Sequence, residues 1–202
     1  MEKNSVIKQY KLTKRQIDLI ESYLVKLKNI NQKLNLVGSS TLMHVWDRHI
    51  NDSLQISKFI PNKNSTIIDL GTGGGFPGLV LNIYGYNNIL LVDSKFKKIK
   101  FIRDFGYENK IEIKTKCSRV ENIKNLKFDF ITCRAFAPLV KILDYSPVFS
   151  KKNTSLLFLK GRNVKKEIND ANKKYTFHHN LFESQSIGGG FILKINTVKR
   201  IL

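Results

Sequence analysis

The chain has 202 residues, of which 35 are Lys or Arg and 16 are Asp or Glu, so its formal net charge is +19 at pH 7. Its 42% hydrophobic and 25% charged residues are typical of a globular domain and exclude a disordered or fibrous chain. No apolar run reaches the roughly 18 residues of a membrane span, the first residues do not resemble a signal peptide, and two cysteines make neither a disulfide framework nor a zinc site. We therefore expect a cytoplasmic, monomeric protein that binds no membrane and no metal.

The excess of positive charge predicts a polyanionic partner, and nucleic acid is the commonest one. Lys outnumbers Arg by 28 to 7, which also fits a coding bias towards Lys. Such a bias explains the choice of Lys over Arg better than it explains 19 surplus positive charges. Composition therefore favours binding to RNA or DNA, with coding bias as the alternative.

The first sixty residues have a helical pattern. Thr13 and Gln16 match a capping box, and apolar residues then recur at helical spacing. A second helical stretch runs from about Thr41 to Phe59. We expect residues 1–60 to form a helical extension packed on a core of residues 61–202, the two making a single structural unit.

From Thr66 onwards, short apolar runs alternate with segments long enough for helices, such as Lys95–Phe105 and Pro138–Phe149. This alternation predicts an α/β fold with a seven-stranded, mostly parallel sheet and helices on both faces. The last two runs, joined across Gly188–Gly190, indicate an antiparallel hairpin at the sheet edge. The expected strands are Thr66–Leu70, Ile89–Asp93, Ile111–Thr115, Phe128–Cys133, Ser155–Lys160, Tyr175–Phe182 and Phe191–Val198.

A glycine-rich loop between the first strand and a helix carries the clearest chemical signal. Its sequence is Asp69-Leu-Gly71-Thr-Gly73-Gly74-Gly75-Phe76-Pro77-Gly78. The last glycines satisfy a dinucleotide fingerprint, as in NAD-binding oxidoreductases. The early acid and three alternating glycines instead resemble the S-adenosylmethionine loop of class I methyltransferases, in which that acid lies near the ligand's ammonium group.

Asp93 closes the second strand and can accept hydrogen bonds from the ribose hydroxyls of either cofactor. It therefore does not discriminate between the two. Asp69 and the seven-strand count favour S-adenosylmethionine, with an NAD-dependent enzyme or a purely structural turn as alternatives.

Three polar residues, His49, Asp52 and Ser53, share one face of the second predicted helix. Asp52 and His49 are our candidate catalytic residues because this face could border a substrate pocket. The equally weighted alternative is an Asp–His pair that pins the helical extension to the sheet.

Further motifs follow along most of the chain. They are Asn35-Leu36, His49-Ile-Asn-Asp52-Ser53-Leu54, Leu91-Val-Asp93-Ser94 with Lys97-Lys98, Ser118-Arg119-Val120-Glu121, Phe128-Asp129, Arg134-Ala135-Phe136-Ala137 and Leu159-Lys160-Gly161. Together with the glycine loop, they resemble the bacterial small-subunit rRNA (guanine-N7)-methyltransferase G family, also called glucose-inhibited division protein B.

The resemblance implies a class I methyltransferase fold with an N-terminal helical extension. The implied activity is methyl transfer from S-adenosylmethionine to guanine N7 in a conserved loop of 16S rRNA, within the small ribosomal subunit. The family's cofactor contacts fall on Gly71, Phe76, Val120, Glu121 and Arg134. To these we add Asp93 from its place at a strand end, and Asp69, Gly73 and Gly75 from the loop. The segment after about Asn172 matches only loosely.

Three neighbouring residues at the end of the fourth predicted strand carry competing interpretations. Arg134 is expected to contact cofactor or phosphate, the alternative being a surface salt bridge with Glu121 or Asp93. Phe136 could stack on a base or belong to the core. Cys133 stands where the family commonly has a small residue, and its thiolate could serve cytosine-C5 methylation, although a buried strand cysteine is the more ordinary interpretation.

Clusters of positive residues near strand ends are candidate RNA contacts, although runs of charge are often only solvated helix faces. A non-catalytic RNA-binding module with a vestigial cofactor site remains the alternative of a different class. The candidate RNA-binding residues are Lys95, Lys97, Lys98, Lys160, Arg162, Lys165 and Lys166.

Overall fold

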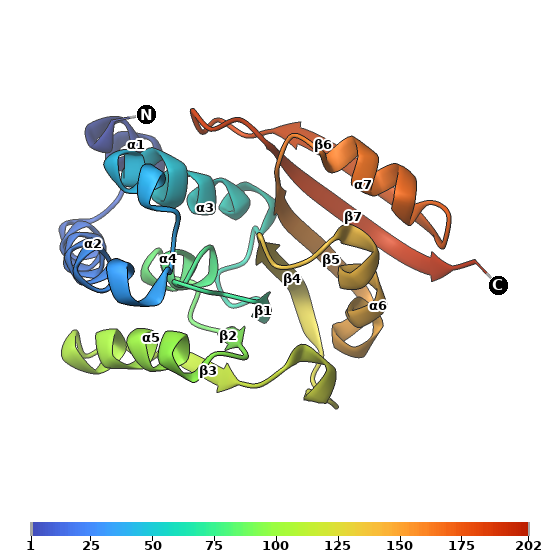
Figure 1. Ribbon diagram of the computed structural model, residues 1–202, viewed down its shortest axis with the longest axis horizontal. Helices are drawn as coiled ribbons and strands as arrows, with labels where there is room; N and C mark the ends of the chain where they lie inside the picture. The colour runs from blue at the N-terminus through green and yellow to red at the C-terminus, as the bar shows by residue number, and fades with distance from the viewer. Residues whose placement is uncertain (1, 202) are drawn as a thin grey trace.

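The computed structural model describes residues 2–201, and in them seven strands form one sheet in the order β3-β2-β1-β4-β5-β7-β6 (Figure 1). The four pairs β3–β2, β2–β1, β1–β4 and β4–β5 are parallel, whereas β7 runs antiparallel to both β5 and β6. This confirms the predicted mostly parallel sheet with a terminal hairpin. The bounds are β1 Ile67–Leu70, β2 Ile89–Asp93, β3 Lys114–Cys117, β4 Phe128–Arg134, β5 Ser150–Lys160, β6 Tyr175–Glu183 and β7 Phe191–Arg200.

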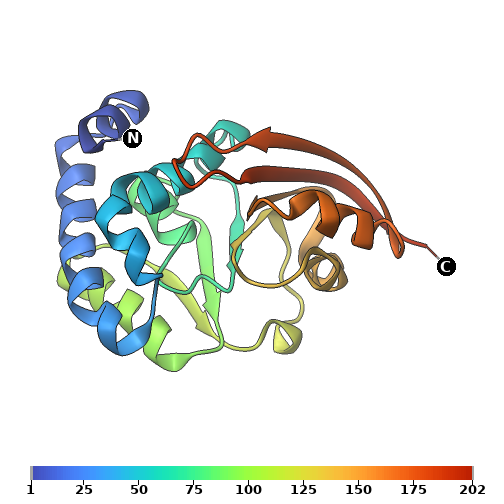
Figure 2. The same cartoon turned by 45° about the horizontal axis from the view of Figure 1, so that its top comes forward.

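Helices cover both faces of the sheet (Figures 1 and 2). One buried apolar cluster joins α2, α4 and α5 to one face, and a second joins α6 and α7 to the other. The bounds are α1 Lys3–Tyr10, α2 Lys14–Leu34, η1 Ser39–His44, η2 Trp46–Asn51, α3 Asp52–Leu54, η3 Gln55–Phe59, α4 Gly78–Ile83, α5 Phe96–Glu108, η4 Val120–Asn122, α6 Leu139–Phe149 and α7 Val164–Ala171.

The third strand differs from the prediction because it begins at Lys114 instead of Ile111. Ile111 and Ile113 precede it and pack against the apolar cluster of the α2 face. The paired residues of β3 are mostly exposed at the sheet edge. The apolar residues Ile111 and Ile113 therefore belong to a loop that packs on the core, and not to the strand itself.

The second predicted helix is also different, because residues 39–59 form four short segments of changing helical type. The segment η2 is a π-helix, which buries Asp47, His49, Ile50 and Asn51 together. Asp47 accepts a hydrogen bond from the Asn51 amide, and Asn51 accepts one from Tyr10. The π-helical geometry thus occurs where buried polar side chains of the segment have hydrogen-bond partners, including Tyr10 from outside the segment. Apolar spacing alone did not indicate this geometry.

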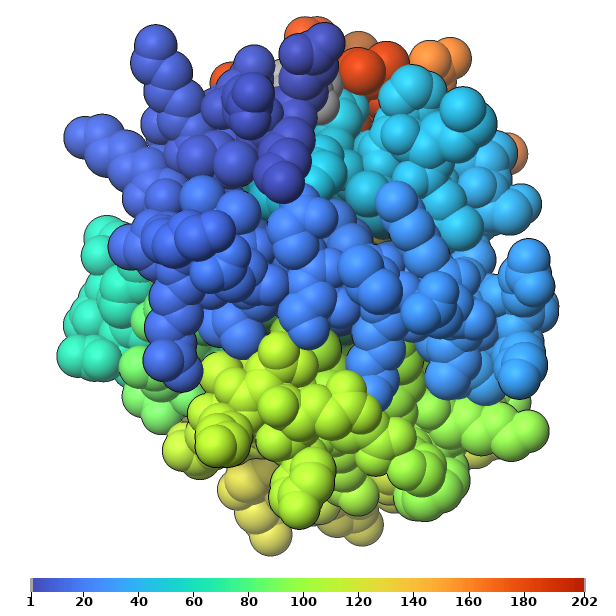
Figure 3. Space-filling view, turned by 90° about the vertical axis from the view of Figure 1, so that its left-hand side faces the viewer, coloured from blue at the N-terminus to red at the C-terminus, as the bar shows by residue number. Residues whose placement is uncertain are grey.

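The long helix α2 lies directly against α5, as the space-filling view in Figure 3 shows. Its start has the predicted capping box, in which the Thr13 hydroxyl accepts from the Gln16 N–H and the Gln16 side chain accepts from the Thr13 N–H. Tyr23 on α2 is fully buried, and its hydroxyl donates to the Gly74 carbonyl in the glycine loop. The helical extension thus supports the loop directly.

Within residues 2–201, no helix combines the length and apolar character that a bilayer crossing requires.

Replacing Tyr23 with Phe is expected to destabilise the fold by about 1–3 kcal/mol, because the buried Gly74 carbonyl loses its donor. Urea unfolding measures the free energy of unfolding. Tyr107, which is 89% exposed, supplies the control Tyr107→Phe, which should change that free energy by less than about 0.5 kcal/mol. Equal stabilities of the two variants would contradict the role of this hydrogen bond.

Candidate active site

Hydrogen bonds to Asp69, which is fully buried, fix the conformation of the glycine loop. One carboxylate oxygen accepts from the Thr72 hydroxyl at 2.6 Å and from the Gly78 N–H at 3.0 Å, and the other accepts from the Thr132 hydroxyl at 3.0 Å. Burial raises the pKa of Asp69 to about 6, and these hydrogen bonds oppose that shift. Asp69 therefore shapes the loop, and in this structure its carboxylate does not face either cavity described below.

Gly71, Gly73 and Gly75 turn the chain at φ values of +67°, +58° and +104°, which side chains other than glycine rarely tolerate. Asp93 at the end of β2 holds this turn from the side. Its carboxylate accepts from the Gly73 N–H at 3.0 Å and from the Lys95 N–H at 2.8 Å. A carboxylate has about four acceptor sites, so Asp93 retains capacity for ribose hydroxyls.

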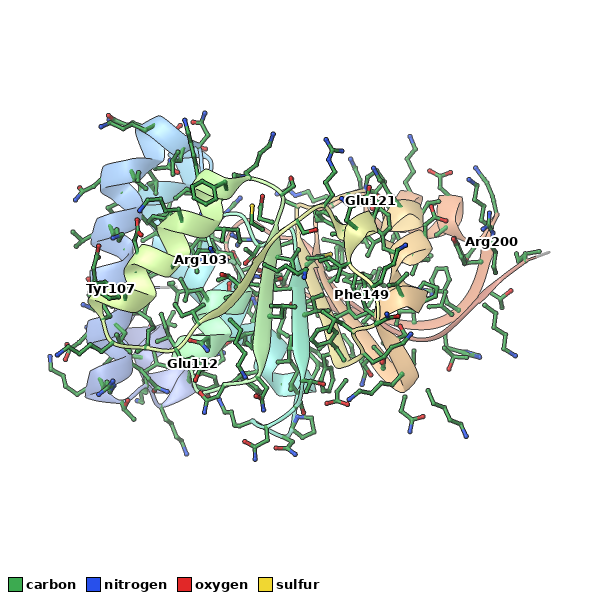
Figure 4. All side chains as sticks on the ribbon, turned by 90° about the horizontal axis from the view of Figure 1, so that it is seen from below. Arg103, Tyr107, Glu112, Glu121, Phe149 and Arg200 are labelled. Atoms are coloured by element: carbon green, nitrogen blue, oxygen red, sulfur yellow. The ribbon has the colours of Figure 1, made fainter. Side chains whose placement is uncertain are left out.

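A cavity of about 340 Å³ opens beside Asp93. Gly71, Val120 and Glu121 also line it, so four predicted cofactor residues meet there. Glu121 accepts a hydrogen bond from the Tyr145 hydroxyl of α6 at 2.5 Å, and Figure 4 shows it beside that helix. The remaining five predicted cofactor residues lie elsewhere: Asp69, Gly73 and Gly75 build the loop, and Phe76 and Arg134 belong to a separate cluster.

That cluster borders a second and larger cavity of about 870 Å³. Its walls come from residues 35–38, from η2 and α3, from the end of β5, from α7 and from the β6–β7 turn. The two cavities share the residues Ala135, Phe136 and Ala137. The helical extension and the terminal hairpin thus complete a pocket that the sheet alone would leave open.

Arg134 stands at the centre of the cluster. Its guanidinium donates to His49 Nδ1 at 2.7 Å, to the Arg48 carbonyl at 3.1 Å and to Asp52 at 3.4 Å. It also lies 4.7 Å from the centre of the Phe76 ring, on which His49 stacks. The alternative of a salt bridge with Glu121 or Asp93 is wrong, because Asp52 is the carboxylate that pairs with Arg134. The expected contact of Arg134 with cofactor or phosphate stays a prediction.

His49 is buried, and burial lowers its pKa to about 3, with the charges of Arg134 and Arg48 acting in the same direction. Because Nδ1 accepts from Arg134, the proton of the neutral ring must be on Nε2. Nε2 then donates to the Thr41 hydroxyl at 2.7 Å, which donates to the Gly38 carbonyl at 2.6 Å. His49 therefore connects Arg134 to the cavity wall at residues 38–41.

Asp52 lies on the same side of Arg134 and is 15% exposed. Its second oxygen accepts from the Ser184 hydroxyl in the β6–β7 turn at 3.0 Å. Burial raises the pKa of Asp52, whereas Arg134 opposes that shift. Ser53 turns away and donates to the His49 carbonyl. The two candidate catalytic residues therefore meet at one cation on the cavity wall, and their catalytic role stays a prediction.

Phe136 lies between the two cavities and is half-buried. It packs so closely on Gly71 that a Cβ atom there would lie 2.2 Å from the phenyl ring. Gly71 therefore serves both the turn and this contact. Phe136 thus packs against the apolar cluster of the α6 face and also separates the two cavities, whereas stacking on a base stays a prediction.

Cys133 is 1% exposed and packs in the apolar cluster that joins α6 and α7 to the sheet. Burial raises the pKa of its thiol well above its usual range. A thiolate is disfavoured there, and the side chain lines neither cavity. The structure therefore contradicts a nucleophilic Cys133.

The candidate RNA-binding cations do not behave alike. Lys95 and Lys98 line the smaller cavity and Lys166 lines the larger one, while Lys97, Arg162 and Lys165 are exposed. Lys160 also borders the larger cavity, but its side chain is only 8% exposed and donates to Glu167 at 2.7 Å and to the Ala137 carbonyl at 3.1 Å. The positive charge of Lys160 is thus already paired with a carboxylate of the protein.

Among residues 2–201, no three His, Cys, Asp or Glu side chains are grouped as a metal site would require.

A family model for rRNA small subunit methyltransferase G matches residues 16–188. A ribosomal RNA small subunit methyltransferase G from Gluconobacter oxydans is 35% identical over 91% of this chain and 94% of its own length. The chain belongs to the rRNA small subunit methyltransferase G family. A member from Rickettsia prowazekii is 34% identical over 92% of this chain and 96% of its own length. This membership overturns the NAD-dependent alternative, whereas the cofactor contacts of the glycine-loop residues stay a prediction.

Solved structures support the same fold at low sequence identity. A ribosomal protein L11 methylase from Lactobacillus delbrueckii subsp. bulgaricus has a TM-score of 0.57 at 16% identity, covering 75% of this chain and 77% of that one. M. jannaschii TYW2 in complex with AdoMet has a TM-score of 0.56 at 14% identity, covering 76% of each chain. The chain thus shares its fold with a ribosomal protein L11 methylase and with an AdoMet-bound TYW2.

Sequence reasoning missed several residues that build the site. Thr132 and Thr72 hold Asp69, and Thr41 accepts a hydrogen bond from His49 Nε2. Arg48 was overlooked although it directly precedes His49 in a recognised motif. Hydroxyl groups carry no periodic signal, so only the position of Arg48 could have been found from the chain.

We expect the His49 ring to stay neutral throughout the physiological range. The folded-state pKa of about 3 lies below the ordinary 6.5, so the unfolded chain binds this proton more tightly. The stability contribution is therefore complete above about pH 6.5 and is lost as the pH falls towards 3. Nuclear magnetic resonance should find constant His49 ring signals from about pH 8 to pH 5. A titration midpoint near 6.5 would overturn the assignment.

Proposed function

We propose that this chain transfers the methyl group of S-adenosylmethionine to N7 of a guanine in 16S rRNA. Family membership over residues 16–188 carries the substrate and the reaction. The observation that carries the cofactor is the glycine loop with Asp93 bound to its Gly73 N–H at the mouth of a cavity. The partition of two adjoining cavities at Phe136 supports one site for the cofactor and one for the base.

The residues of the smaller cavity fit this cofactor. Asp93 offers acceptor oxygens for ribose hydroxyls, and Val120 and Glu121 line the same cavity and would hold the rest of the nucleoside. Gly71 has no Cβ, which lets the backbone approach a ligand closely. S-adenosylmethionine supplies an electrophilic methyl group on a sulfonium, and the chain has to position it.

The chemistry requires little acid–base work from the protein. Guanine N7 has an exposed lone pair, so no general base has to remove a proton before attack. The chain can act through orientation of the base towards the methyl group, which alone reduces the barrier strongly. The base becomes cationic during transfer, which a nearby carboxylate favours. Asp52 borders the larger cavity, with one oxygen on Arg134 and the other on the neutral Ser184 hydroxyl.

Arg134 and His49 hold the walls of this cavity in place and do not exchange protons with the substrate. A guanidinium keeps its proton in proteins, and the low pKa of His49 keeps its ring neutral. Asp52 compensates the Arg134 charge and binds the hairpin through Ser184. Both His49 and Asp52 line the cavity, and Asp52 is the better candidate for direct contact with the base because it carries the negative charge that a cationic base favours.

The decisive experiment incubates the protein with labelled S-adenosylmethionine and small ribosomal subunits that lack the modification. We expect label in 16S rRNA at a single guanine, with the chemical signature of N7-methylguanine after strand cleavage. Free 16S rRNA in a parallel reaction distinguishes the assembled subunit from the naked RNA as substrate. Label at a cytosine, or none, would refute the proposal.

Asp93→Asn should weaken S-adenosylmethionine binding by at least about tenfold, because one acceptor oxygen and the negative charge are lost. Titration calorimetry measures this dissociation constant. Asp104→Asn is the matched control, since Asp104 pairs only with Lys100 on the surface of α5. Unchanged affinity of the Asp93 variant, with a native circular dichroism spectrum, would show that the cofactor binds elsewhere.

Cys133→Ala should retain methylation because the thiol is buried away from both cavities. The variant loses buried contacts and should be less stable by about 1 kcal/mol. Initial rates measured at a temperature where both proteins stay folded test this expectation. Loss of methylation with intact cofactor binding would revive the cytosine-C5 mechanism.

A further inference from the structure

Two arginines lie against the turn between β6 and β7, and one of them, Arg48, lines the larger cavity. A Cβ atom at Gly188 would lie 2.0 Å from the Arg48 guanidinium, and one at Gly189 would lie 3.6 Å from that of Arg162. Arg48 and Gly189 both line the cavity. The two guanidinium groups therefore lie against consecutive residues of one turn, although they come from η2 and from the end of β5.

Glycine is needed at position 188 because a side chain there would collide with Arg48, and not because of the backbone conformation. Gly189 and Gly190 have φ values of +64° and +111°, so the turn itself requires glycine at those two positions. Gly188 is outside that conformation and could adopt its backbone with any side chain. A side chain at this position would displace Arg48. The turn thus provides a seat for one guanidinium.

Both arginines are available to an external anion. The cavity-lining carboxylates already have cations: Asp52 pairs with Arg134, Glu167 with Lys160, and Asp170 with Lys173. Within the described residues 2–201, neither Arg48 nor Arg162 forms an ion pair. Two unpaired guanidinium groups against one turn beside the cavity favour an oxyanion.

We propose that Arg48 and Arg162, seated on Gly188 and Gly189, bind a backbone phosphate of the RNA segment that presents the target base. This inference rests on the proposed function. An RNA phosphate fits better than the carboxylate of the cofactor, because Arg48 borders the larger cavity and Asp93 borders the smaller one. A phosphate held at the rim would fix the backbone while the base enters.

The test measures binding of unmodified small subunits to Arg48→Gln and Arg162→Gln over a series of salt concentrations. Each variant should bind about tenfold more weakly, and the slope of log affinity against log salt should become shallower by about 0.7. Arg200→Gln is the matched control, because Arg200 is exposed at the far end of β7 (Figure 4). It should leave both quantities near those of the unaltered protein.

Gly188→Ala tests the contact between Gly188 and Arg48 without changing the glycines that the turn conformation requires. The backbone tolerates alanine, so the variant should fold, yet the new methyl group occupies the place of Arg48. Its RNA affinity should fall as in Arg48→Gln, and the double variant should be no weaker than either single one. Full additivity of the two effects would refute the seat.

Titration with S-adenosylmethionine distinguishes the two oxyanions. Unchanged cofactor affinity in both arginine variants supports the phosphate assignment. A loss of cofactor affinity assigns the arginines to the cofactor carboxylate and overturns the proposal, as does an unchanged salt slope. Failure of the unaltered protein to methylate would refute the proposed function instead, because these binding measurements do not depend on turnover.

Discussion

Arg134 places a permanent positive charge within the protein, and the surrounding structure compensates it from several directions. An unpaired buried charge would be very unfavourable, so a carboxylate, a carbonyl, an imidazole and an aromatic face converge on it. Asp52, Arg48 and His49 come from the helical extension, Phe76 comes from the glycine loop, and Arg134 itself ends β4. The charge thereby fixes the extension, the cofactor loop and the sheet in one arrangement around the larger cavity.

The same network reaches the terminal hairpin. Asp52 accepts from Ser184, and Asp47 and Gln55 accept from the backbone N–H groups of Ile187 and Gln185. Three side chains of one short helical region thus hold the turn that closes the cavity. Residues of η2 and α3 therefore line the cavity and also support the hairpin, which explains why catalytic and structural interpretations of His49 and Asp52 were equally plausible from the chain alone.

Most of the sheet could be predicted, because apolar runs and helix-length intervals are local patterns. The glycine loop and Asp93 were likewise found from spacing along a strand–loop–helix unit. The details that were wrong depend on contacts across the chain. Arg134 and Asp52 are 82 positions apart, and no pattern in either segment indicates that they pair. The π-helical turn of η2 similarly depends on buried polar partners, which hydrophobic spacing does not report.

The lysines of β3 have a consequence for the behaviour of the protein in concentrated solution. This strand lies at the open end of the sheet, and its unpaired backbone groups could recruit a strand from another molecule. Lys114 and Lys116 occupy two of its four positions, so two such edges that approach each other meet like charges. The positive charges of this strand would therefore oppose its pairing with the same strand of a second copy of the chain.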